Sequence, residues 1–171
     1  MRRTGKHGMA ALLVASMFLL MGCTGGSGVL DSVFGSGKKI VGKDIAMQEI
    51  TEFYYTYSTS TDPPHYQRYH FSVKDGKHVF YHEQREGDHW PLKEKDITVS
   101  GTKELSDEEW ATFFDLIKGG TVEKRKEDYG SGGSGPWLFL YWKGDRGKYQ
   151  EFSFASWDAK TSFETFCVAL R

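Results

Sequence analysis

YQRYHFSVKDGKHVFYHEQ, residues 66–84, holds two strand patterns on either side of Asp75-Gly76. Apolar or aromatic residues alternate with polar ones in each half, which is typical of strands that bury one face. Asp-Gly between two such runs is a strong signal for a tight hairpin. We therefore predict an antiparallel pair of strands, at about 66–73 and 77–84.

This hairpin can close in two registers, and the choice decides where its histidines point. A two-residue loop places His78 and His82 on the apolar face, beside Phe71. A bulge at Gly76 shifts the pairing by one residue, and such a slip exchanges the two faces completely. We expect the bulged form, because an unpartnered buried polar group costs about 1–3 kcal/mol and the other form buries two imidazoles.

Further strand patterns lie at about 49–58, 96–101, 136–142 and 149–154. In the first of them Phe53, Tyr55 and Tyr57 alternate onto one face, and aromatic residues favour the pleated surface of a sheet. The highly charged segment 121–128 fits either an edge strand or a loop.

Two amphipathic helices are expected. Ser106 and Glu109 form a capping box, and the apolar residues after it have the spacing of one buried stripe. The stripe consists of Trp110, Phe113, Phe114 and Ile117. Thr161 and Glu164 form a second capping box, which predicts a helix over about 161–170. Its apolar stripe consists of Phe163, Phe166, Cys167 and Leu170.

Strands in hairpins with helices at intervals indicate an α+β fold. We predict an antiparallel sheet of about six strands with two amphipathic helices on one face, a two-layer sandwich. The expected organisation is a signal peptide at 1–22, a flexible Gly/Ser-rich tether at 23–43 and a single globular domain at 44–171.

The charge of the chain excludes one class of partner. Residues 1–22 hold three of the 22 lysines and arginines and none of the 23 acidic residues. Without them the chain has 19 basic against 23 acidic side chains, a formal charge of −4. Nucleic acid would require a basic surface, so we expect no nucleic-acid partner.

The N-terminus has the pattern of an export signal. Arg2, Arg3 and Lys6 are followed by an apolar run of 13 residues, Met9 to Met21. A bilayer span needs about 20 residues, whereas the apolar centre of a secretory signal needs roughly 7–15. The run therefore predicts export.

Leu20-Met21-Gly22-Cys23 resembles the end of a bacterial lipoprotein signal. Leu20 and Gly22 match that family's pattern, and Met21 stands where Ala or Ser is usual. The resemblance implies cleavage between Gly22 and Cys23, and acylation of Cys23 by membrane lipid. Two or more acyl chains hold a protein firmly, since each buried methylene contributes about 0.8 kcal/mol. The alternative is an ordinary cleavable signal in which Cys23 is incidental.

The resemblance also implies a location outside the cytoplasm. The anchor would lie in the outer leaflet of the cell membrane in a Gram-positive cell. Thr24 is not Asp, so in a Gram-negative cell the outer membrane is expected. The layout of residues 48–171 is similar to that of small uncharacterised lipoproteins of Gram-positive bacteria, which implies a fold and no activity.

Five of the six histidines lie between His65 and His89. In the bulged register His70, His78 and His82 share one sheet face and become candidate ligands for zinc or copper, metals that imidazole suits. The alternative is that these histidines lie on a solvated sheet face.

The aromatic residues exceed what one core face can take up. Alternation in residues 137–142 gives both faces of that strand bulky apolar side chains. Exposed aromatic patches mark binding sites, so Trp90, Trp137 and Trp142 form a candidate ligand platform. The alternative is that loops or the segment 121–135 bury them.

No motif for catalysis or for a cofactor stands out. Cys167 lies on an apolar helix stripe, where cysteine behaves as an inert hydrophobic residue. The glycines of 130–135 lack the Lys-Ser/Thr and the following helix of a phosphate-binding loop. We expect no catalytic residue and no cofactor.

These patterns together predict a membrane-anchored extracytoplasmic lipoprotein with one non-enzymatic binding or interaction module. Its ligand would be an envelope protein or a carbohydrate. One alternative is an extracytoplasmic metal-binding or metal-dependent hydrolytic protein that uses the His65–His89 region. A second is an inhibitor or accessory subunit of an envelope complex.

Overall fold

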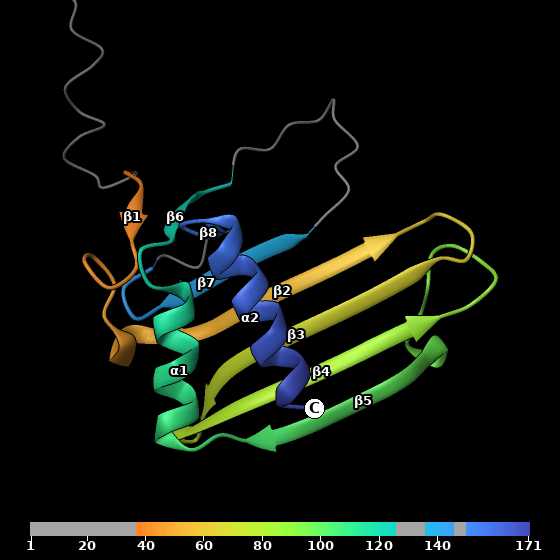
Figure 1. Cartoon of the computed structure of the whole chain (residues 1–171), viewed down its shortest axis with the longest axis horizontal. Coiled ribbons are helices and arrows are strands. Elements are labelled where there is room, and N and C mark those ends of the chain that lie inside the picture. The colour runs from red at the N-terminus through yellow and green to blue at the C-terminus, as the bar shows by residue number, and fades with distance from the viewer. Residues whose placement is uncertain (1–36, 126–135, 146–149) are drawn as a thin grey trace, which may run out of the picture.

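The computed structural model describes residues 37–125, 136–145 and 150–171. Within them one antiparallel sheet of eight strands carries two α-helices, and both helices lie on the same face of the sheet (Figure 1). The predicted α+β class is therefore confirmed, but the sheet has eight strands and not about six. The cleavage site, Cys23 and the glycines of 130–135 lie outside the described residues.

Neighbouring strands in the chain are mostly neighbours in the sheet. The strands are β1 (Lys39–Ile40), β2 (Ile50–Thr59), β3 (His65–Lys74), β4 (Lys77–Glu86), β5 (Ile97–Glu104), β6 (Thr121–Lys124), β7 (Trp137–Trp142) and β8 (Gln150–Ser153). Their order across the sheet is β1-β6-β8-β7-β2-β3-β4-β5. Short 3₁₀ turns, η1 (Met47–Glu49) and η2 (Glu94–Asp96), precede β2 and β5. The long strands β2 to β5 form a meander.

We expected the globular domain to begin at residue 44. The packed region begins earlier in the chain. β1 pairs with β6, and Val41 and Ile45 are fully buried. The Val41 amide donates to the carbonyl of Gly120 at 2.9 Å, and the Gly119 amide donates to the carbonyl of Val41 at 2.9 Å. Because β1 lies outside it, β6 is an inner strand, and not the edge strand or loop that we expected in this segment.

The hairpin register is the two-residue one, so the expected bulge is wrong. Lys74 pairs with Lys77, and the φ angles of Asp75 and Gly76 are 52° and 78°. Two positive φ angles define the hairpin turn whose twist matches that of the flanking strands. The free-energy cost that we expected for burying the His78 imidazole is reduced, because this ring is only partly buried. It also stacks on the Trp110 ring, with the ring centroids 4.3 Å apart.

The core lies between the sheet and the helices α1 (Asp107–Ile117) and α2 (Trp157–Ala169). Phe53, Phe71 and Phe80 are aligned across β2, β3 and β4 and are fully buried. Phe113 of α1 stacks on Phe71 at 4.1 Å, and Phe163 of α2 contacts Phe53 at 5.3 Å. Each of these rings removes about 150–250 Å² from water, so they dominate the packing.

The cap of α1 is confirmed, and that of α2 is not. Ser106 accepts from the Glu109 amide at 3.1 Å, and Glu109 accepts from the Ser106 amide at 2.9 Å. The second helix begins at Trp157 with Ser156 as its cap. Thr161 lies inside the helix, where its hydroxyl donates to the carbonyl of Trp157 at 3.1 Å. The apolar stripe is as predicted, with Phe163, Cys167 and Leu170 buried and Phe166 partly buried.

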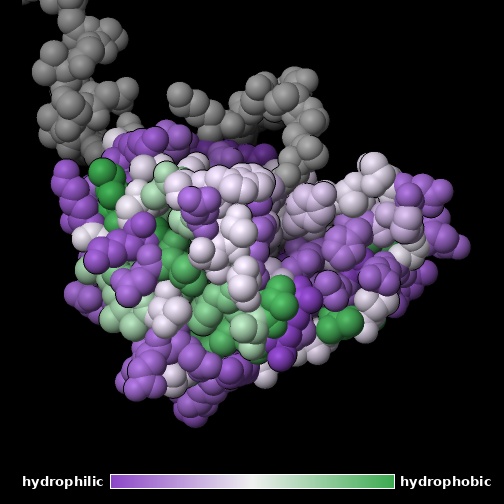
Figure 2. Space-filling model, in the orientation of Figure 1, coloured by the Kyte–Doolittle hydropathy of each residue, from purple (hydrophilic) through white to green (hydrophobic). Residues whose placement is uncertain are grey.

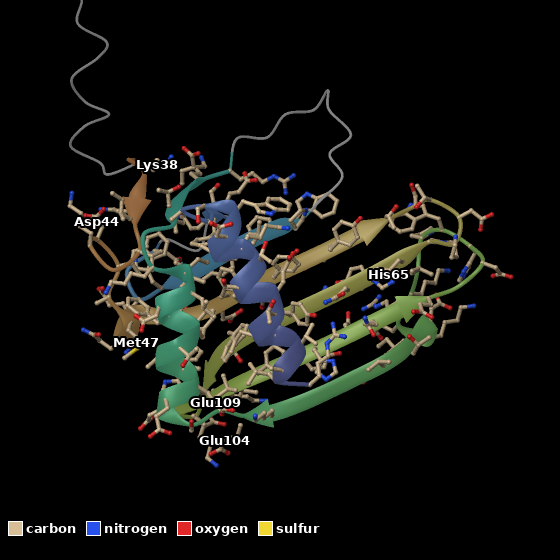
Figure 3. All side chains as sticks on the ribbon, in the orientation of Figure 1. Lys38, Asp44, Met47, His65, Glu104 and Glu109 are labelled. Atoms are coloured by element: carbon tan, nitrogen blue, oxygen red, sulfur yellow. The ribbon has the colours of Figure 1, made fainter. Side chains whose placement is uncertain are left out.

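The helices cover only part of their face of the sheet. β2 to β5 extend beyond them, to the right in Figure 1. Figure 2 shows hydrophobic residues beneath and beside the helices, and mostly hydrophilic residues on the extension. His65 lies on this extension, and Glu104 and Glu109 lie at the other end of the sheet, where β5 leads into α1 (Figure 3). Among the described residues no helix is long and apolar enough to cross a membrane.

Gly120→Ala tests the close packing between α1 and β8. A Cβ at this position would lie 2.4 Å from two carbons of the buried Phe152 ring and 2.9 Å from the carbonyl oxygen of Ile117. Neither can move freely, so we expect the free energy of unfolding in urea to fall by about 1–3 kcal/mol. Gly37→Ala is the control, because a Cβ there meets nothing within 4 Å. Equal unfolding midpoints for the two variants would contradict this packing.

Candidate functional site

The sheet face opposite the helices, which we call the open face, carries a polar and aromatic surface. Phe53 and Tyr55 point toward the helices, so Glu52, Tyr54 and Thr56 point to the open face. The strand registers place the side chains of β3, β4 and β7 beside them. These neighbours are Arg68, His70, Tyr81, Glu83, Phe139 and Tyr141.

A pocket of about 540 Å³ lies on the open face, over β2, β3 and β7. This volume is in the usual range for a small-molecule site, about 300–1,000 Å³. Aromatic rings supply much of its wall, and the rest is polar. The lining residues are Thr51, Glu52, Tyr54, Thr56, Arg68, Phe139, Tyr141, Trp142 and Asp145.

Glu52, Tyr54 and His70 form a connected group at this pocket. The Tyr54 hydroxyl donates to the Glu52 carboxylate, and the His70 ring stacks on the Tyr54 ring at 4.1 Å and 9°. His70 Nε2 lies 3.5 Å from Glu52 Oε2. Burial lowers the pKa of His70 despite the opposing effect of Glu52, and burial with the hydrogen bond to Glu52 raises the pKa of Tyr54. At neutral pH Tyr54 therefore remains a donor and His70 is uncharged.

A second group holds Arg68 at the edge of the pocket. The Glu83 carboxylate, whose side chain is 3 % exposed, accepts from Arg85 at 2.8 Å and lies 3.9 Å from Arg68. The Tyr81 hydroxyl donates to Glu83 at 2.6 Å. Burial, followed by this hydrogen bond, raises the pKa of Tyr81 to about 12. Both guanidinium groups lie over the Tyr66 ring, at 5.5 Å for Arg68 and 4.7 Å for Arg85.

The three histidines predicted as metal ligands do not come together. His70 lies on the open face, whereas His78 and His82 lie on the helix face, because the hairpin has the register we rejected. Within the described ranges, no three metal-ligating side chains are grouped closely enough to hold an ion. The hypothesis depended on the bulged register, and the observed register removes its geometric basis.

The predicted tryptophan platform is divided among three places. Trp90 lies in the loop after β4 and is 51 % exposed. Trp137 and Trp142 stand at opposite ends of β7, and of the three only Trp142 lines the pocket. Tyr54, Phe139 and Tyr141 complete the wall. The alternation of aromatic residues along β2 and β7 is visible in the sequence. Only the pairing of these two strands shows that the three side chains lie on the same wall.

A second pocket of about 520 Å³ lies beside α2, on the uncovered part of the helix face. Its charged groups already have partners within the fold. Lys160 pairs with Glu164 at 2.9 Å, Glu164 accepts from the Tyr55 hydroxyl, and Arg171 donates to the Tyr69 hydroxyl. We therefore regard the open-face pocket as the stronger candidate site.

Comparisons of the chain with protein-family models, with curated proteins and with solved structures found no match.

His82→Gln tests the burial of an imidazole on the helix face. Burial and then the nearby Arg171 charge lower the pKa of His82, and its Nδ1 has no partner within the described residues. The unfolded chain binds this proton near the ordinary pKa of about 6.5, so the folded state loses stability as the pH falls below that value.

We expect the variant to lose less stability than the wild type between pH 8 and pH 5, in urea unfolding followed by circular dichroism. The difference between the two proteins at pH 8 serves as the control, because it reports packing without titration. Parallel stability curves over the whole range would contradict the assignment.

Proposed function

We propose that this chain is a membrane-anchored lipoprotein outside the cytoplasm whose domain binds a carbohydrate in the open-face pocket. The anchor is supported by Leu20, Gly22 and Cys23 at the end of the apolar run. The ligand class is supported by one observation above all, which is a pocket that combines aromatic walls with carboxylate, hydroxyl and guanidinium groups.

This combination matches the surfaces of a sugar. A sugar ring has an apolar C–H face, which can lie on an aromatic ring, and hydroxyl groups around its edge. Glu52 and Asp145 can accept hydrogen bonds from such hydroxyls, and Arg68 can donate to their oxygens. In small-molecule sites the apolar and aromatic walls hold the ligand, and the polar groups fix its orientation.

We propose binding without turnover. Glu83, the most buried carboxylate of the described residues, faces two arginines and accepts from Tyr81, so it has a structural role. The metal-dependent hydrolytic alternative loses support, because His70 is separated by the sheet from His78 and His82. An inhibitor or accessory subunit would need a surface that binds another protein, and no specific observation on the described residues favours one.

Cys23→Ser tests the anchor. Serine cannot form the diacylglyceryl thioether that the resemblance implies, so the acyl chains and their membrane affinity are lost. We expect the wild-type protein in the membrane fraction of a bacterial host and the variant in the medium or the soluble envelope fraction. Cys167→Ser, which removes the buried thiol, is the matched control and should stay with the membrane. Equal membrane retention of all three proteins would refute acylation at Cys23.

Tyr141→Ala tests the pocket. Removing one aromatic wall should weaken binding of an oligosaccharide, selected from a glycan array, at least tenfold in calorimetry. Trp90→Ala removes an aromatic ring that lies outside the pocket, so its affinity should equal that of the wild type. Melting curves check that both variants fold. Equal losses in both variants, or no loss in either, would count against this pocket.

A further inference from the structure

We infer that the carbohydrate of the open-face pocket is an amino sugar, held through its ammonium group by Glu52 and the surrounding aromatic rings. This rests on the proposed function and narrows its ligand class. Three features of the pocket support it.

The first feature is the charge of Glu52. Its side chain is 43 % exposed and lines the pocket. Within the described part of the chain, the only basic group within ion-pair distance of this carboxylate is His70 Nε2, at 3.5 Å. His70 is half-buried and uncharged at neutral pH, as derived above. Glu52 therefore presents a negative charge to the pocket, and no lysine or arginine of the described residues lies within ion-pair distance of it.

The second feature is the number of acceptor oxygens in the lining. The polar lining holds two carboxylates, Glu52 and Asp145, and four hydroxyls, those of Thr51, Tyr54, Thr56 and Tyr141. Arg68 is the one cation of the lining, and it already faces the Glu83 carboxylate at 3.9 Å. An ammonium group brings three N–H donors and a positive charge, which this lining matches. A carboxylate-bearing sugar would meet the like charge of Glu52.

The third feature is the geometry of the rings. Tyr54 and Tyr141 stand nearly perpendicular, with centroids 6.1 Å apart and planes at 88°. Two rings in this arrangement form a corner, and the faces of aromatic rings attract cations. Phe139, in the same wall, already has the Arg125 guanidinium 6.0 Å from its centroid. The chain thus places one of its own cations on this aromatic surface.

A matched set of tetrasaccharides tests the inference. The full-length protein, purified in detergent, is titrated by calorimetry with glucosamine, N-acetylglucosamine and glucose tetramers, all with the same β-1,4 linkage. We expect the glucosamine tetramer to bind at least tenfold more tightly than the other two. Its affinity should fall with added salt, because screening weakens charge attraction.

Glu52→Gln should reduce this preference to threefold or less, since it removes the charge and keeps the shape. Glu104→Gln is the control: Glu104 is a more exposed carboxylate at the end of β5, paired with Lys77 at 2.7 Å, and the preference should persist. Circular dichroism checks that both variants are folded.

Each other outcome has a distinct meaning. If the acetylated or neutral tetramer binds as tightly as the amine, the inference is overturned and carbohydrate binding stands. If no tetramer binds, both the inference and the proposed function fail. If tetralysine binds as tightly as the glucosamine tetramer, the pocket recognises basic peptides and the amino-sugar assignment is overturned.

Discussion

The alignment of Phe53, Phe71 and Phe80 across three neighbouring strands is the constraint on which the rest of the structure depends. These rings form the floor of the core, and Phe113 and Phe163 close it from the two helices. Side chains alternate along a strand, so fixing this row also fixes every residue on the other face. A slip of one residue would exchange the two faces.

The open face is the consequence of that alignment. Tyr54, His70 and Tyr81 form the complementary row, one position along each strand from the phenylalanines. Arg68 connects the two polar groups of this face, because it lies near the buried Glu83 and also lines the pocket. The proposed binding surface therefore lies on strands in the middle of the sheet, β7, β2 and β3.

Local sequence patterns correctly predicted the features that depend only on neighbouring residues. The strands β2 to β5, the Ser106 cap and the apolar stripes of both helices agree with the sequence, since neighbouring residues alone determine them. The hairpin register does not agree with the prediction from the sequence. The His78 ring stacks on Trp110, which lies 32 positions later in the chain, and no local pattern indicates this contact. β1 was missed since two residues are too few to show a period. The start of α2 was missed because Trp157 is 73 % exposed and adds nothing to the apolar stripe.

The candidate site was predicted least well, because it is formed by residues that are far apart in the chain. Trp142 belongs to it, but Tyr54 and Tyr141 meet only through the pairing of β2 with β7, which are about 80 residues apart in the chain. The most direct test of the account is a crystal structure of the protein soaked with the glucosamine tetramer. The account predicts sugar density on the open face, against Tyr141 with its nitrogen at Glu52. Density only in the pocket beside α2, with the open face empty, would contradict it.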